Sequence, residues 1–190
     1  MNEYNETDNS VLTEYAKYLD DLVEKDQNIV FLNSSSKHAS MVISRIFKHS
    51  NKEVLIRAKD LMSDIPKDID YIIELMNFII RGGFLRILLS EYKTDNPPEI
   101  LKVLKLFSKK QVDIKLTNVN FILQESGEVV HFTVGTKNVS DTKPAMYRLE
   151  HDINNFLATG NFNDPNISSN LQSQFYQIFN SDKSTEVISF

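Results

Sequence analysis

Cysteine is absent from the 190 residues of this chain. Its absence excludes a disulfide scaffold, a thiol nucleophile and a zinc site with cysteine ligands. Glycine is scarce, at five residues, whereas Asn, Ser, Lys and Ile are abundant. This usage is typical of an AT-rich bacterial or phage genome. The length suffices for one well-packed α/β domain and leaves little for a second.

Long apolar segments are also missing. The longest nearly apolar run, residues 71–80, contains Glu74 and Asn77 and is too short to cross a bilayer. The polar start MNEYNETDNS has neither the positive nor the apolar region of a signal peptide. We therefore expect a cytoplasmic protein that makes no membrane contact.

Positive charge is not in excess. The formal net charge is −5, which is unlike a dedicated nucleic-acid binder, although a local basic patch remains open. The chain contains no G-x-G-x-x-G, no G-x-x-x-x-G-K and no H-E-x-x-H pattern. The sequence predicts no cofactor and no metal, and it leaves a nucleic-acid partner undecided.

Hydrophobic periodicity divides the chain into alternating strands and helices. We expect strands at residues 29–32, 52–58, 84–89, 112–116, 120–124, 129–134 and 146–149. We expect amphipathic helices at residues 10–25, 37–49, 69–81 and 98–109, and a last one through Leu171, Phe175, Ile178 and Phe179. The strand–helix alternation up to residue 116 favours parallel pairing, and residues 125–128 favour a hairpin turn.

The predicted fold class is therefore α/β, with a mixed β-sheet flanked by helices. The polar residues 1–9 are predicted to be disordered, residues 10–180 to form a single domain, and residues 181–190 to be a loose tail.

One stretch, residues 129–164, contains a pattern that indicates a functional site. His131-x-Thr133, four residues and Asn138 are followed by a polar turn at residues 158–161, Ala-Thr-Gly-Asn. This arrangement resembles the phospholipase D superfamily signature, H-x-K-x4-D followed by a G-S-x-N-like turn. The strand–helix–strand order that begins with the EVLIRA strand is also similar to the half-domain of that superfamily. The resemblance covers roughly residues 37–180.

The resemblance implies a two-step phosphodiester chemistry. One histidine attacks phosphorus, a second protonates the leaving oxygen, and lysines with the polar turn stabilise the phosphoryl oxygens. It assigns His131 and Asn161 as catalytic candidates, and Thr133, Lys137 and Thr159 as anion-binding candidates. Because one motif supplies one histidine, it also implies a homodimer through the motif face.

The motif is degenerate at two positions. Threonine stands at the lysine position, Thr133, and asparagine at the aspartate position, Asn138. The leading hypothesis is therefore a domain with the phospholipase D-like fold that acts as a dimeric structural, protein-interaction or anion-binding module. The alternative is an active phosphodiesterase or nuclease whose rearranged site uses His131, Lys137 and Asn161.

Simpler readings of the same residues remain. In one of them, His131 is an ordinary structural histidine on a strand. In another, the domain has an unrelated α/β fold. Arg148 and Glu150 share one face of a strand and form either a functional pair near His131 or a structural ion pair. His49 lies near a helix C-terminus, where a partly charged imidazole is favoured by the helix dipole.

Overall fold

Eight strands form one mixed sheet in the computed structural model, which describes residues 3–122, 129–137, 144–152, 157–181 and 183–188. The strands are β1 (Phe31–Asn33), β2 (Glu53–Ala58), β3 (Phe84–Leu89), β4 (Val112–Thr117), β5 (His131–Gly135), β6 (Met146–Asp152), β7 (Leu157–Asn161) and β8 (Thr185–Val187). The helices are α1 (Glu3–Glu24), α2 (Ser36–His49), the 3₁₀ helix η1 (Ile65–Lys67), α3 (Ile69–Ile80), α4 (Ile100–Leu104) and α5 (Pro165–Phe179). The predicted α/β class with a mixed sheet flanked by helices is confirmed.

The strands lie in the order β1-β7-β6-β5-β2-β3-β4-β8. The centre of the sheet, β2-β3-β4, is parallel and is connected by α3 and α4. All the other pairs are antiparallel. The prediction of parallel pairing is therefore correct for β2, β3 and β4. It is wrong for β1, which pairs antiparallel with β7 at one edge of the sheet.

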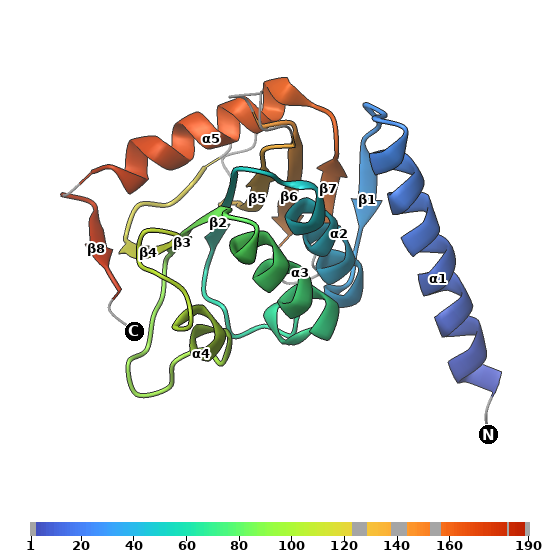
Figure 1. The fold of residues 1–190 in the computed structure, drawn as a ribbon, viewed down its shortest axis with the longest axis horizontal. Helices are drawn as coiled ribbons and strands as arrows, with labels where there is room; N and C mark the ends of the chain where they lie inside the picture. Colours follow the sequence, from blue (N-terminus) through green and yellow to red (C-terminus); the bar gives the residue numbers. More distant parts are fainter. Residues whose placement is uncertain (1–2, 123–128, 138–143, 153–156, 182, 189–190) are drawn as a thin grey trace.

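Helices cover both faces of the sheet (Figure 1). On the first face, the helices α1 to α4 bury one apolar core against the strands. On the second face, α5 buries a smaller core that is rich in aromatic rings. Successive strand residues point to opposite faces, so Ile56 belongs to the first core and its neighbour Leu55 to the second.

Regular structure extends close to both ends of the chain. α1 begins at Glu3, although the sequence predicts disorder over residues 1–9. The polar run before Ser10 shows no apolar periodicity, yet a helix that is nucleated further along extends by one hydrogen bond per residue. Within the tail that the sequence predicts to be loose, β8 pairs antiparallel with β4 and Ile188 is buried.

Three elements differ in extent from the expectation. The 158–161 segment is part of strand β7 and not a turn. The hairpin expected before β5 is represented by one bridge between Ile122 and Val129, and its turn residues lie outside the described part of the chain. α4 is shorter than the predicted 98–109 helix.

Candidate functional site

Four polar residues of β5 and β6 share the first face of the sheet. In the antiparallel register His131 lies opposite Glu150, and Thr133 lies opposite Arg148. Thr133 is also opposite Ile56 of β2, which belongs to the first core. The cross-strand pairing therefore brings an imidazole, a hydroxyl, a guanidinium and a carboxylate together beneath the helical layer.

Glu150 is the common partner of the two nitrogen-bearing side chains. Its Oε2 lies 3.5 Å from Nδ1 of His131, and its Oε1 lies 3.4 Å from a terminal guanidinium nitrogen of Arg148. The Nε of Arg148 donates to Oδ1 of Asn33 at 3.0 Å. Asn33 ends β1 and in turn donates to the carbonyl oxygen of Ala158 at 3.3 Å. The side chains of Glu150, Arg148 and Asn33, which form this series of contacts, are all buried, so the sheet fixes their geometry.

Burial shapes the electrostatics of this cluster. Burial lowers the pKa of Arg148, while the Glu150 carboxylate acts in the opposite direction. Burial raises the pKa of Tyr15, on α1, to about 12, and the nearby Arg148 cation partly offsets that rise. The guanidinium is thus a desolvated cation whose charge is partly balanced by one carboxylate.

A cavity of about 390 Å³ opens above these residues, at the carboxyl end of β2. This volume falls in the range of small-molecule sites, roughly 300–1,000 Å³. The walls of the cavity are mixed, with polar residues on the sheet and an apolar helical side. They comprise Ile43, Ile56, Arg57, Ala58, Lys59, Asp60, Leu61, Met62, Ser63, Ile65, Pro66, Tyr71, His131, Phe132, Thr133, Arg148 and Glu150.

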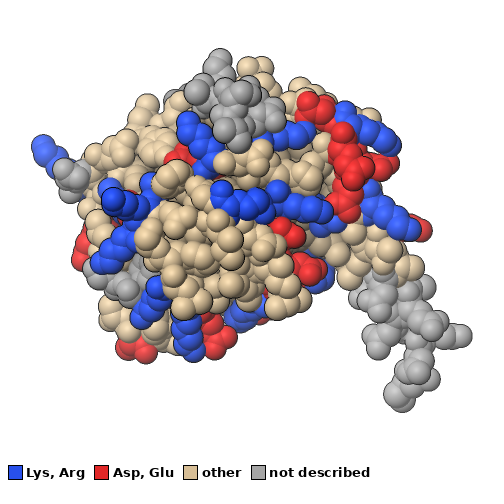
Figure 2. All heavy atoms as spheres, viewed as in Figure 1, with Lys and Arg blue, Asp and Glu red and all other residues tan. Residues whose placement is uncertain are grey.

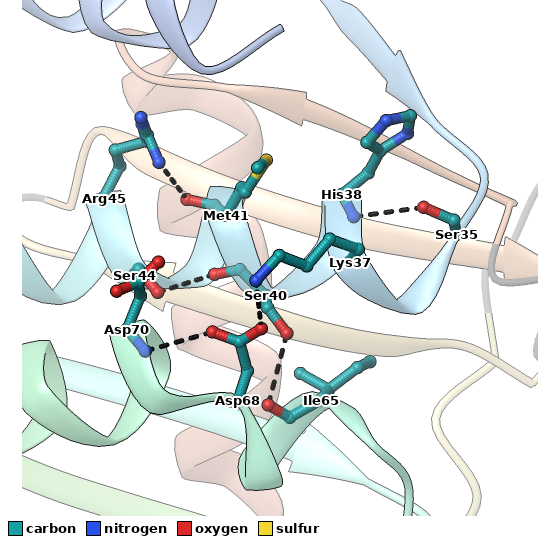
Figure 3. A network of polar contacts seen from close by, with 10 residues as sticks. All are labelled: Ser35, Lys37, His38, Ser40, Met41, Ser44, Arg45, Ile65, Asp68 and Asp70. Atoms are coloured by element: carbon teal, nitrogen blue, oxygen red, sulfur yellow. Dashed lines mark hydrogen bonds and ion pairs between the residues drawn. The ribbon is translucent and has the colours of Figure 1, made fainter. Parts of the chain in front are cut away.

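A polar network fixes the helical wall over the cavity (Figure 3). Nζ of Lys37, at the start of α2, lies 2.6 Å from Asp68, which caps α3. Ser40 of α2 donates to the carbonyl oxygen of Ile65 at 3.2 Å. These contacts join α2 to η1 and α3, and thereby hold Ile65 and Tyr71 above the sheet.

Arg57 adds positive charge without a carboxylate partner among the described residues. Its side chain is 1% exposed and donates to the carbonyl oxygen of Ala58 at 2.7 Å and to Oγ of Ser90 at 2.6 Å. Burial lowers the pKa of Arg57 to about 10, so the group stays cationic at neutral pH. The guanidinium joins the ends of β2 and β3 beside the cavity.

The other site residues predicted from the sequence lie elsewhere. Thr159 faces the second side of the sheet, where its hydroxyl lies 2.8 Å from Nε2 of His151. Asn161, also on β7, donates to Asn28 at 2.7 Å and accepts from the backbone of Asn163 at 2.8 Å. These contacts fix a turn beside β7.

Lys137 follows the end of β5, whereas His131 begins it. Its ammonium group pairs with Asp26 and donates to the carbonyl oxygen of Val23. Asn138, at the aspartate position of the motif, lies outside the described residues. The structure therefore joins His131 to Thr133, and it does not bring Lys137, Thr159 or Asn161 to them.

Sequence reasoning did not single out Asn33, which binds Arg148, or Tyr71, which lines the cavity. Asn33 stands at the end of a short strand and Tyr71 on an amphipathic helix, and neither position carries a motif. The pair Arg148 and Glu150 was recognised because their spacing places both on one strand face, although its proximity to His131 required the β5–β6 register.

The described part of the chain lacks two kinds of feature, a metal-binding cluster and a membrane-spanning helix. No group of three or more His, Asp or Glu side chains is arranged to hold a metal ion there. Among the same residues, no helix combines the length and apolarity needed to cross a membrane.

Sequence comparison finds no relative, since no protein-family model and no curated protein matches the chain. Solved structures do match. Nuc from Salmonella typhimurium, a phospholipase D family member, is similar with a TM-score of 0.51 and 11% identity, over 86% of this chain and 100% of Nuc. The fold is phospholipase D-like.

Two other structures share this fold. TrmBL2, an archaeal chromatin protein that shows a novel mode of DNA binding, is 15% identical with a TM-score of 0.51, over 94% of this chain. The chain spans 62% of the length of TrmBL2. Polyphosphate kinase from Porphyromonas gingivalis has a TM-score of 0.56 and 8% identity, over 83% of this chain and 26% of the kinase. At such identities the likeness shows the fold alone, and function has to be argued from the site.

Proposed function

We propose that this phospholipase D-like domain binds a small anionic ligand in the cavity above β5 and β6 without hydrolysing it. The observation that carries the proposal is the buried guanidinium of Arg148 in the lining of that cavity. The cations Lys59 and Arg148 line it together with the carboxylates Asp60 and Glu150. The guanidinium of Arg57, at the end of β2, is directed toward β3. An anion that enters would exchange water for buried donors, where hydrogen bonds to charged groups are strongest.

The absence of hydrolysis follows from what surrounds His131. Thr133 takes the place of the motif lysine, and the cation opposite it, Arg148, already pairs with Glu150. Loss of one donor that stabilises the developing charge typically slows such chemistry about 10²- to 10³-fold. Lys137 and Asn161, which the sequence offers as replacements, are engaged elsewhere.

One observation favours phosphodiester hydrolysis as the second candidate. Glu150 lies beside Nδ1 of His131, and a carboxylate at this position fixes an imidazole so that Nε2 is the reactive nitrogen. In this alternative Arg148, and not Lys137, would supply the positive charge that the motif lysine provides in the superfamily.

Homodimerisation through the face that carries His131 belongs to the same proposal. A two-fold axis would bring two cavities together and enclose the ligand further. Light scattering should give twice the mass of the chain at micromolar concentration, and a monomer would contradict this part. A small anion is favoured over nucleic acid because Lys and Arg are scattered among other side chains on the face drawn in Figure 2, and the net charge is −5.

Calorimetric titration with inorganic phosphate and with pentanoate tests the anion site. The key variant is Arg148→Met/Glu150→Met, which removes both charges together and leaves no orphaned buried ion. We expect it to fold and to lose binding, whereas the control Arg86→Met, outside the cavity lining, should bind as the wild type does. Binding that survives in the double variant would contradict the proposal.

Hydrolysis is tested separately on DNA, RNA and bis(p-nitrophenyl) phosphate. The wild type and His131→Ala should show the same null activity. Activity that disappears with His131 would establish the second candidate instead.

A further inference from the structure

Tyr71 is a buried residue in the helical wall of the cavity. The residue is 4% exposed, lines the cavity from α3, and packs its ring edge-on against Phe47 at a centroid distance of 5.1 Å. Within the described structure, no hydrogen bond from the Tyr71 hydroxyl is present. An acceptor that enters the cavity can therefore receive a hydrogen bond from this hydroxyl.

The hydroxyl is available as a donor under all ordinary conditions. Burial raises the pKa of Tyr71 far above its usual value, so the phenol stays protonated. The network of Figure 3 holds its backbone, because Asp68 both caps α3 at the backbone N–H of Asp70 (3.0 Å) and pairs with Lys37 of α2. A fixed, protonated donor favours one ligand orientation, since little conformational freedom is lost on binding.

The cavity therefore has polar groups on two sides. On the sheet, Thr133 also has a hydroxyl without a partner in the described part of the chain, next to Arg148 and His131. On the helical side the polar atom is the hydroxyl of Tyr71. The remaining helical and loop wall has five apolar residues, Ile43, Leu61, Met62, Ile65 and Pro66, together with Lys59, Asp60 and Ser63 of the loop after β2.

From this arrangement we infer that Tyr71 contacts the ligand directly, and that the ligand is a small acid with an apolar middle and a carbonyl or hydroxyl oxygen at its far end. The inference rests on the proposed anion site, which would take the acidic group beside Arg148. The apolar wall would contact the hydrocarbon part, and Tyr71 would donate to the distal oxygen. A bare phosphate ion fills only one part of this site.

Levulinate, which joins a carboxylate to a keto oxygen through a short apolar segment, is the first probe, with its two next-longer homologues. Each is compared by calorimetry with the alkanoate of equal length that lacks the keto oxygen. We expect at least one keto acid to bind the wild type about 5- to 10-fold more tightly than its alkanoate, the value of one hydrogen bond.

The deciding variant is Tyr71→Phe, which removes the hydroxyl and keeps the ring. It should abolish the preference for the keto acid and leave alkanoate binding unchanged. The control Tyr92→Phe lies in a neighbouring hollow, outside this cavity, and should keep the preference. A preference that persists in Tyr71→Phe, or that is absent from the wild type, overturns the inference.

Two further readouts separate the possible failures. If alkanoate binding requires Arg148 but no keto acid binds more tightly than its alkanoate, the anion site is supported and the role of Tyr71 is wrong. If no acid binds at all, the proposed function falls with it. The melting temperature of Tyr71→Phe should not decrease, because the hydroxyl has no protein partner to lose, and a marked decrease would reveal such a partner and count against the inference.

Discussion

The two faces of the β5–β6 pair are made from alternating residues of the same strands, and they differ in kind. The first face presents His131 and Thr133 to a cavity. The second presents Phe132 and Val134 to α5, in a core of packed aromatic rings. The second face is thus filled by the protein, whereas the first retains polar groups whose partners are incomplete. The proposed binding site rests on this contrast, because only the first face leaves a cavity beside the strands.

The largest effect is expected on the packed face, from Phe175→Ala. This fully buried ring contacts the rings of Phe132 and Phe179, so its loss should lower the free energy of unfolding by about 3–5 kcal/mol. Urea denaturation measures the change. The exposed Phe84→Ala is the matched control and should cost under about 1 kcal/mol. Anion binding by the folded fraction should persist, and its loss would contradict the separation of the two faces.

On the cavity face, Glu150→Gln should have the next largest effect. The change leaves the buried Arg148 without its carboxylate and is expected to lower the free energy of unfolding by about 2–3 kcal/mol. The control Glu91→Gln breaks an exposed pair with Lys59, in which both side chains are 53% exposed, and should cost under about 1 kcal/mol. If both variants lose the same free energy of unfolding in urea denaturation, the buried Arg148–Glu150 pair contributes no more to stability than the exposed pair.

Thr133 and Val134 are adjacent on β5 and point to opposite faces of the sheet, so exchanging their side-chain types compares the two faces directly. Val134→Thr puts an unsatisfied hydroxyl into the packed core and should cost about 1–3 kcal/mol without affecting anion binding. Thr133→Val removes a hydroxyl without a partner in the described structure, so stability should change by less than about 1 kcal/mol while anion affinity falls several-fold. Thermal melting measures the stability of both variants, and calorimetry measures their anion affinity. If the two variants change stability and affinity alike, the contrast between the faces is wrong.

The smallest effect concerns titration of His49 in the helical layer over the cavity face. Burial, together with Lys48 and Lys137, lowers the pKa of His49 in the folded state. The unfolded chain then takes up the proton first, so this contribution to stability is present above a pH of about 6.5 and is lost as the pH falls through the lowered pKa. His49→Gln should flatten the dependence of urea midpoints on pH below neutrality. An unchanged slope would show that another group titrates there.

The result for His49 also shows where local reasoning is limited. Its place near the C-terminus of α2 favours the charged imidazole by the helix dipole. Burial acts in the opposite direction, as do the adjacent Lys48 and, from the segment after β5, Lys137. Position along a helix is visible in the sequence, whereas the neighbours brought by the fold are not.

Regular elements could be predicted because their signals are local. The apolar run FLRILL indicated β3 with its correct bounds, and Asp68 with the following isoleucines indicated α3. The pairing of the edge strands β1 and β8 was not predicted, because it depends on a distant neighbour, β7 for one and β4 for the other. Three-residue strands carry too little periodicity to reveal such partners.

By itself, the sequence determined the alternation of strands and helices and the absence of cysteine. Only the tertiary structure decided which polar groups meet. A strand residue points to one face or the other, and the register of β6 against β5 places Arg148 and Glu150 beside His131 while Thr159 and Asn161 face away. Register follows from which apolar faces are buried over the whole sheet, and it therefore cannot be read from a motif whose spacing counts residues along one chain.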